Sequence, residues 1–340
     1  MVHKDIFEKE FMNLVLSSKR SNYFINQNSN LVPIVLNNSF SFEDFLVFNM
    51  GNNCNLILPP CNLIVNNTIK IRDLKNVCFT GSIENNSIRT NVFLNGGHSL
   101  FEIINSENIL FQNLNLIGPH SYFKESVGIM FKHCDSVRVN RCNIKNFGRS
   151  GIEFFYSNGL VNQSIISFSL MKDTSGWKND LGTRKNMGYG VNVNSSQVKV
   201  SRSLIEKCSH AIASSGINVH YNFTTNLVRQ CGLNLLPFGD LELNGHAIDT
   251  HANHEGTFHI ARNLIYKTNV GIWLRGGNGS VEDNYFINCN EGVRVGPTYS
   301  EYNNLLKLGQ PSKRQSVNFS ENYFDDIFED KKITLVNYDS

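Results

Sequence analysis

Short stretches of alternating hydrophobic and polar residues recur along the chain, and each ends in a small or polar turn. Six of them share a beginning, in which glycine or alanine precedes isoleucine or valine: SGIEFFYS (150–157), YGVNVNSS (189–196), HAIASSGI (210–217), HAIDTHAN (246–253), VGIWLRGG (270–277) and EGVRVGPT (291–298). Between them lie stretches such as SVRVNRCNIKN and TFHIARNLIYKT, which read as strand, polar turn and strand. This two-residue period predicts β-strands throughout.

The small residue at the second position of these stretches gives the length of the repeat. It occurs at Gly128, Gly151, Gly190, Ala211, Ala247, Gly271 and Gly292, with separations of 23, 39, 21, 36, 24 and 21 residues. The short separations are one unit, and the two long ones hold a unit plus an insertion. No intervening segment reads as a long helix, which argues against βαβ units. Repeats of this length with two or three strands predict the coils of a single-stranded parallel β-helix, an all-β solenoid.

We expect one β-helix domain over residues 1–340. Residues 51–326 would form the coils, residues 327–340 would cap the last coil, and residues 1–50 would cap the first. The N-terminal cap is predicted to contain an amphipathic helix, because apolar residues recur there at helical spacing. These residues are Phe7, Phe11, Leu14 and Val15.

Asparagine recurs at equivalent turns of the repeat, at Asn263, Asn284 and Asn322. Such residues can hydrogen-bond to their equivalents in the next coil. The eight cysteines form no CxxC pair and sit in apolar-periodic stretches, which predicts small buried thiols rather than a zinc site.

Composition then limits the partners. With 31 basic and 29 acidic residues the net charge is +2, so no nucleic-acid footprint stands out. No apolar run is long enough to span a bilayer. The first residues, MVHKDIFEKEF, lack the apolar core of a signal peptide. We therefore expect neither nucleic acid nor membrane as a partner, and a cytoplasmic or phage-associated location.

The lead-in segments LILPP, TIKI and VCFTGS, followed by these coils, resemble the right-handed parallel β-helix proteins of the pectate-lyase-like superfamily over roughly residues 50–326. HAIASSG and HAIDTHANHEG are similar to segments of β-helix proteins in phage tails and polysaccharide-processing enzymes. AIDTHANHE is also similar to the DPH segment of mannuronan C5-epimerases, with Thr250 in place of the proline. The resemblance implies a right-handed helix and a glycan partner.

Aligning the repeats places polar residues in columns. The apolar third position points into the core, so the fourth and sixth positions point outward. The fourth column contains Glu153, Asn192, Ala213, Asp249, Trp273 and Arg294, and the sixth contains Phe155, Asn194, Ser215, His251, Arg275 and Gly296. Tyr189, His210 and His246 share the first position. Since adjacent coils lie about 4.8 Å apart, these columns predict one polar groove.

The groove is suited to an acidic polysaccharide, and β-elimination of a uronic-acid glycan is the function we predict first. This reaction needs a base, a group that neutralises the carboxylate, and an acid. His251, His246 or His210 would be the base, oriented by Asp249, and Tyr189 the acid. Arg275, or Asn192 with Asn194, would bind the substrate carboxylate. Three further candidates for substrate binding are Trp273, Arg294 and, in the insertion 170–188, Trp177.

Four alternatives stay open. A mannuronan-type C5-epimerase would use the same groups, whereas a glycoside hydrolase needs a second carboxylate near Asp249. A divalent cation such as calcium could be held by His246, Asp249, His251 and His254, although no cofactor is required by the sequence. The chain could also be a non-catalytic glycan-binding protein of a phage tail or cell surface, acting as a monomer or a homotrimer.

Overall fold

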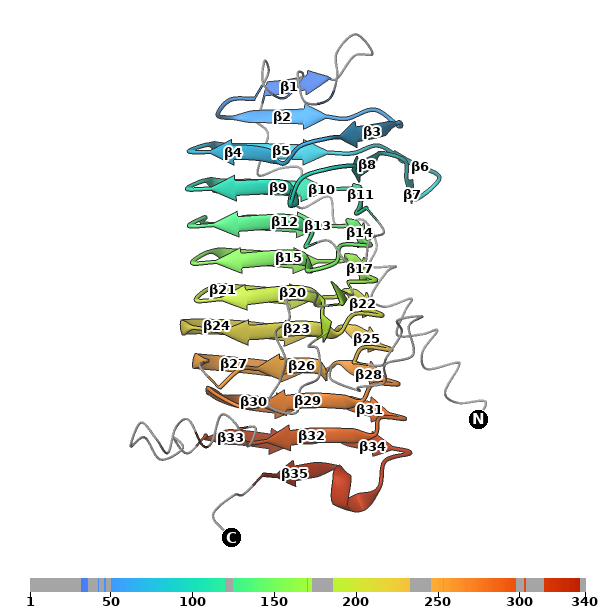
Figure 1. The fold of residues 1–340 in the computed structure, drawn as a ribbon, viewed down its shortest axis with the longest axis vertical. Helices are drawn as coiled ribbons and strands as arrows, with labels where there is room; N and C mark the ends of the chain where they lie inside the picture. Colours follow the sequence, from blue (N-terminus) through green and yellow to red (C-terminus); the bar gives the residue numbers. More distant parts are fainter. Residues whose placement is uncertain are drawn as a thin grey trace.

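The computed structural model describes residues 32–35, 42, 46, 50–119, 125–169, 171–172, 186–232, 246–252, 254–297, 303 and 315–336. These residues form a stack of coils (Figure 1), and each coil contributes one strand to each of three long parallel sheets. Along the chain, a strand of the first sheet is followed by one of the second and one of the third. This confirms the predicted parallel β-helix.

The first sheet, here sheet A, has 11 strands. They are β1 (Val32–Val35), β2 (Cys54–Ile57), β5 (Lys75–Thr80), β10 (Glu107–Gln112), β13 (Val137–Asn140), β16 (Asn158–Asn162), β21 (Gln197–Ser201), β24 (Ile217–Thr224), β27 (Glu255–Ala261), β30 (Asn278–Glu282) and β33 (Val317–Ser320).

The second sheet, sheet B, has 10 short strands. They are β3 (Asn62–Val65), β8 (Asn91–Leu94), β11 (Asn115–Ile117), β14 (Asn143–Lys145), β17 (Ile165–Ser167), β22 (Leu204–Glu206), β25 (Leu227–Arg229), β28 (Leu264–Tyr266), β31 (Tyr285–Ile287) and β34 (Tyr323–Asp325).

The third sheet, sheet C, also has 10 strands and carries the repeat with the small second residue. They are β4 (Ile69–Arg72), β9 (Ser99–Ile104), β12 (Val127–Lys132), β15 (Ser150–Phe155), β20 (Tyr189–Asn194), β23 (His210–Ser215), β26 (His246–Thr250), β29 (Val270–Leu274), β32 (Glu291–Val295) and β35 (Ile333–Leu335).

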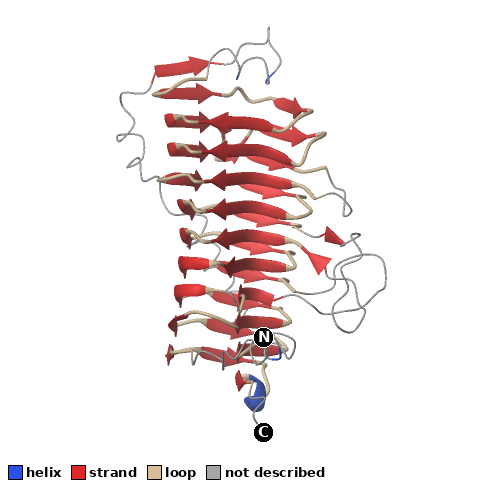
Figure 2. Ribbon diagram, turned by 60° about the vertical axis from the view of Figure 1, so that its left-hand side comes forward, coloured by secondary structure: helices blue, strands red, loops and turns tan. Residues whose placement is uncertain are grey.

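Two short strand pairs and one 3-10 helix are inserted between successive strands within the coils. Two antiparallel pairs, β6 (Ile83–Glu84) with β7 (Ser87–Ile88) and β18 (Met171–Lys172) with β19 (Asn186–Met187), interrupt the order of the coils. The 3-10 helix η3 (Glu329–Lys331) precedes β35, so the predicted C-terminal cap adds a last strand to sheet C. Figure 2 shows the stack of strands from another side, with η3 beside the C-terminus.

The core runs along the axis of the stack and includes a column of phenylalanines. Phe79 and Phe111 stack with ring centroids 4.7 Å apart, and Phe131 and Phe154 continue the column at 5.2 Å. The repeated small residue of sheet C lies where the sheets approach each other. At Gly271 a Cβ atom would come within 2.6 Å of the Gly292 carbonyl oxygen and 2.7 Å of the Phe286 ring. Close packing against the adjacent coil therefore disfavours any side chain at Gly271 and keeps the second position small along the stack.

The predicted asparagine ladder is confirmed and is one coil longer than the sequence suggested. It runs through Asn226, Asn263, Asn284 and Asn322, and the side-chain oxygens of the last three accept from the asparagine of the preceding coil. The Asn263 side-chain oxygen also accepts from the Asn226 backbone N–H at 2.9 Å, and its amide donates to the Phe223 carbonyl at 2.8 Å. The ladder thus satisfies buried backbone groups at the turn between sheets A and B.

The cysteines and the N-terminal segment bear on the remaining fold predictions. All eight cysteines are free thiols and seven are buried, as predicted. The amphipathic helix predicted near the N-terminus lies outside the described residues, but Phe42 and Leu46 are buried against the core and β1 pairs with β2. Within the described part of the chain, no helix has the length and apolar character needed to cross a bilayer.

Candidate functional site

The side-chain columns predicted from the repeats are confirmed by the strand register of sheet C. Asp249 pairs with Ala213 on one side and with Trp273 on the other. The same register aligns Tyr189 with His210, and His210 with His246. The first-position and fourth-position residues of β20, β23, β26 and β29 therefore lie together on the outer side of sheet C.

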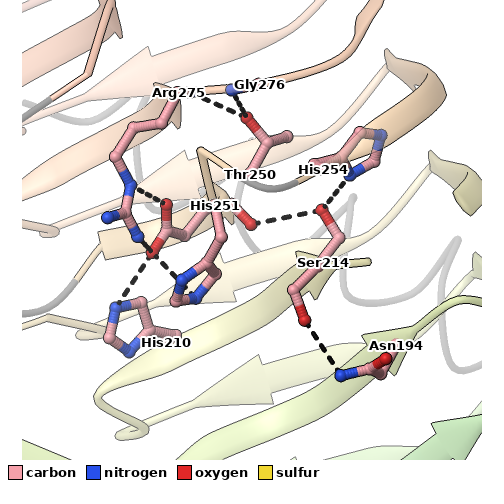
Figure 3. A network of polar contacts seen from close by, with 10 residues as sticks. Asn194, His210, Ser214, Thr250, His251, His254, Arg275 and Gly276 are labelled. Carbon is pink, nitrogen blue, oxygen red and sulfur yellow. Dashed lines mark hydrogen bonds and ion pairs between the residues drawn. The ribbon is translucent and has the colours of Figure 1, made fainter. Parts of the chain in front are cut away.

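Asp249 is the centre of this cluster, and Figure 3 labels the side chains of Arg275, His210 and His251 that contact it. Its side chain is only 1% exposed, and Arg275 from the next coil donates to both carboxylate oxygens. The Arg275 Nε lies 3.0 Å from Oδ1 and a terminal guanidinium nitrogen lies 2.6 Å from Oδ2. The Nε2 atoms of His210 and His251 each lie 3.5 Å from Oδ2. One buried carboxylate thus contacts three side chains from three successive coils.

Burial alone would raise the pKa of Asp249, but the charge of Arg275 outweighs it and holds the pKa well below its usual range. Bidentate pairing with a guanidinium satisfies both oxygens of the carboxylate. Asp249 is therefore an anion at any ordinary pH, suited to orient or stabilise a neighbouring group but not to donate a proton.

Arg275 requires a correction to the sequence-based prediction. We expected it to bind a substrate carboxylate, whereas its guanidinium binds the carboxylate of Asp249. Its side chain is 11% exposed and also lies over the Trp273 ring, 5.2 Å from the centroid. The prediction differed because the strand register fixes the column in which a residue lies but not the direction in which a long side chain extends.

The three histidines expected to face an open groove differ in accessibility. His210 and His246 are buried, with rings 5.2 Å apart, and Tyr189 packs on His210 at 5.3 Å. Burial lowers the pKa of His210 to about 4 and that of His246 well below its usual value. Both are therefore neutral near pH 7 and enclosed. His251 is the histidine whose side chain, 33% exposed, can meet a substrate.

Tyr189 is half-buried, and its burial, reinforced by the charge of Asp249, raises its pKa to about 12. It therefore keeps its proton at neutral pH and can act as a donor. Asn194 donates to the Ser215 hydroxyl at 3.2 Å, and Asn192 occupies the fourth column as predicted. Trp177 lies outside the described residues.

Trp273 and Arg294 close the cluster on the C-terminal side. The Trp273 indole donates to the Gly296 carbonyl at 2.8 Å, and its ring packs edge-on against His246 at 4.6 Å. Arg294 lies over the same ring at 4.7 Å and is bound to Glu291, a partner that the sequence columns did not identify. The two predicted binding residues are thus already engaged with each other.

A polar cluster inside the β-helix backs the site, and sequence reasoning missed it. The Ser214 hydroxyl lies 2.8 Å from His254 Nδ1 and donates to the Asp249 carbonyl at 3.4 Å (Figure 3). Thr250 accepts from the Arg275 backbone N–H at 2.9 Å. Ser214 and Thr250 occupy an inward position that is apolar in the other aligned repeats. This break in the hydrophobic pattern is the sequence signal that could have indicated the cluster. His254, expected in a turn, is buried here, and burial lowers its pKa to about 4.

A second buried carboxylate, Glu153, occupies the same column three coils from Asp249. Its Oε1 accepts from Arg149 Nε at 2.9 Å and from the Ser150 hydroxyl at 2.7 Å. Three strand spacings separate the two carboxylates by about 14 Å. Hydrolysis needs carboxylates about 5–10 Å apart. Glu153 and Asp249 therefore do not form a hydrolytic pair.

The predicted metal ligands are arranged differently from the expected set. The ligand atoms of His210, His246 and Asp249 lie within 4.8 Å of one another, whereas His254 turns into the core. Arg275 already supplies a positive charge to both oxygens of Asp249. A cation bound here would face that guanidinium, so the residues present do not fit a metal while this ion pair is intact.

No family model matches the chain, and no curated protein is similar in sequence. Solved structures match in fold. The endo-xylogalacturonan hydrolase of Aspergillus tubingensis aligns with 91% of this chain and 96% of its own, at 8% identity and a TM-score of 0.50. Pectate lyase Pel9A aligns with 91% and 78%, at 12% identity and a TM-score of 0.45. The Dettilon tailspike protein aligns with 84% of this chain, at 12% identity and a TM-score of 0.42.

The chain spans 57% of the length of that tailspike and of the ORF18 protein of Geobacillus virus E2. At such identities the likeness concerns the fold alone, which is the right-handed parallel β-helix.

Proposed function

We propose that the protein cleaves an acidic polysaccharide by β-elimination, with His251 as the general base. The observation that carries this proposal is the position of His251 in the cluster. Its Nε2 lies 3.5 Å from an Asp249 carboxylate that stays ionised, and its side chain is 33% exposed. A neutral imidazole held beside an anion can take a proton, because the anion stabilises the imidazolium that forms.

The remaining roles follow from protonation state and position. His251 would remove the proton at C5 of a uronate, a C4=C5 double bond would form, and the C4–O bond would break. Tyr189, whose pKa is raised to about 12, would give its proton to the leaving oxygen. Since Arg275 is engaged with Asp249, the side-chain amides of Asn192 and Asn194 are the donors we assign to the substrate carboxylate.

The test is a screen of the full chain against polygalacturonate and alginate, read by the ultraviolet absorbance of the new double bond. His251→Gln should lower kcat about a hundredfold to ten-thousandfold. His98→Gln, which changes an exposed histidine remote from the site, is the matched control and should retain activity. A chelator should have no effect, because the residues do not fit a metal.

The outcomes separate the alternatives. New reducing ends without absorbance would indicate a hydrolase, and a changed uronate ratio without cleavage would indicate an epimerase. Full activity in His251→Gln would reject the assignment of the base. Binding without any product would favour a glycan-binding protein.

A further inference from the structure

A second polar surface lies on sheet A, away from the Asp249 cluster on sheet C. A shallow groove of about 540 Å³ crosses β13, β16, β21, β24 and β27. Among its lining residues are four basic or imidazole side chains, and none of the lining residues is Asp or Glu. They are Arg138, Lys199, His220 and His259. The groove therefore offers cations and hydrogen-bond donors, and Asp135, which accepts from the lining residues Asn158 and Ser136, lies at its N-terminal end.

The two histidines of the groove are fixed by bonds to the following coil. His220 Nδ1 lies 2.8 Å from the Thr257 hydroxyl, and His259 Nδ1 lies 2.8 Å from the Ser280 hydroxyl. Each bond leaves Nε2 as the ring atom for a ligand. The imidazoles thus stand in defined orientations on adjacent strands, at the spacing of the coils.

A row of arginines follows the same coils at the turn after sheet A. Arg141, Arg202 and Arg262 occupy one turn position in alternate coils, with left-handed φ values of 53°, 50° and 56°. All three are exposed. Two strand spacings place successive arginines about 10 Å apart.

The row has a definite end. The next two coils carry Asp283 and Glu321 at this turn, so the cations are confined to the coils that also form the groove. The left-handed region is sparsely used by side chains other than Gly, Asn and Asp. Gln163 and Thr225 share this left-handed turn in the coils between, so the three arginine side chains, rather than the backbone, distinguish this row, and they lie in the coils that also form the groove. The net charge of the whole chain is only +2, so this charge is local.

We propose that this face of sheet A binds an anionic glycan that runs along the stack, with negative charge recurring about every second sugar. The groove would hold the sugar rings and hydroxyls, and the arginine row would contact carboxylates or sulfates. Alternate coils are separated by a distance comparable to a disaccharide, so an extended chain can meet each arginine in turn. This binding needs no chemistry at His251 and is independent of the proposed reaction.

The experiment measures binding of polygalacturonate, dextran sulfate and neutral dextran to the full chain at rising NaCl concentrations. Both anionic polymers should bind, more weakly as salt rises, and neutral dextran should not. The triple variant Arg141→Gln/Arg202→Gln/Arg262→Gln should bind roughly tenfold more weakly at low salt. A control with the same loss of charge, Arg72→Gln/Arg89→Gln/Lys331→Gln, should bind like wild type.

Equal binding by the triple variant and the control would overturn the proposal, as would binding that ignores salt. Tighter binding of duplex DNA than of either polymer would overturn the choice of ligand. Polymer binding by His251→Gln should equal that of wild type. A failure of the proposed reaction therefore leaves this test intact.

Discussion

Arg275 and Asp249, on successive coils of sheet C, form a bidentate ion pair in which the carboxylate is 1% exposed and the arginine side chain 11% exposed. The ion pair offsets the cost of burying the Asp249 carboxylate and holds it in a fixed position at the centre of the candidate site. It also explains why two neutral histidines can pack beside it, because the negative charge is already balanced.

Removing one partner of this pair should therefore be costly. Arg275→Met leaves Asp249 as a buried, unpaired charge, and we expect a loss of about 3–5 kcal/mol in the free energy of unfolding. Urea denaturation measures it. The double variant Asp249→Leu/Arg275→Met should recover much of the loss, because it leaves no charge behind. If Arg275→Met alone unfolds like wild type, the pair does not exist in solution.

Acid should destabilise the protein through its buried histidines. His210 and His254 have pKa values of about 4 in the folded chain, against an ordinary value of 6.5. Between these values the unfolded chain binds more protons, so stability is present above pH 6.5 and falls as the pH drops to 4. Each pKa unit corresponds to about 1.4 kcal/mol. Asp249 does not add to the pH dependence of stability in this window, because the stability that its lowered pKa contributes is lost only below the ordinary pKa of an aspartate.

Urea midpoints between pH 7 and pH 4 measure this dependence. The double variant Ser214→Ala/His254→Leu removes one buried imidazole with its hydrogen-bond partner and should flatten the slope. His133→Gln, at an exposed position, should leave it unchanged. An unaltered slope in the double variant would show that His254 does not resist protonation.

The asparagine ladder should contribute strongly to stability. Asn263→Ala leaves the Asn226 backbone N–H and the Phe223 carbonyl without their partners in a fully buried turn. We expect a loss of about 2–4 kcal/mol in unfolding free energy, measured by urea denaturation. Asn158→Ala, at an exposed position of β16, is the comparison and should change stability by less than about 0.5 kcal/mol. Equal effects of the two would mean that the ladder is not stabilising.

At the small second position of the sheet C repeat, replacing alanine by glycine should be tolerated better than replacing glycine by alanine. Gly271→Ala places a methyl group within 2.6 Å of the Gly292 carbonyl oxygen and should cost about 1–3 kcal/mol. Ala247→Gly, the reciprocal change in the preceding coil, should cost only about 0.5–1 kcal/mol. Thermal unfolding of both variants compares them. A Gly271→Ala protein as stable as wild type would show that the coils can separate locally.

Sequence reasoning reached the fold and the columns because a two-residue period and a repeating small residue together specify the register. If the strand register slipped by one residue, Ile248 would face outward and Asp249 would face the apolar core. The register could therefore be predicted, and with it the pairing of Asp249 with Trp273. The turn asparagines were predictable for the same reason.

The aligned repeats could not predict the direction or the burial of long side chains. Arg275 turns back to Asp249 rather than outward, and His210 and His246 are enclosed although they stand on the outer side of the sheet. Ser214 with His254, and Arg149 with Glu153, join residues whose partners depend on rotamers and on loops between the coils. The arginine row was missed because it lies in turns, which a search for strand periodicity passes over.

The division of the stack into coils has a consequence for how such a chain can evolve. Each coil contacts only its neighbours, and the candidate site draws on the consecutive strands β20, β23, β26 and β29. Duplicating or deleting a whole coil nearer the N-terminus would lengthen or shorten the rod without disturbing that neighbourhood. Deleting a single residue inside one of the four strands would put the site out of register. The length of the rod and the candidate site can thus be selected separately.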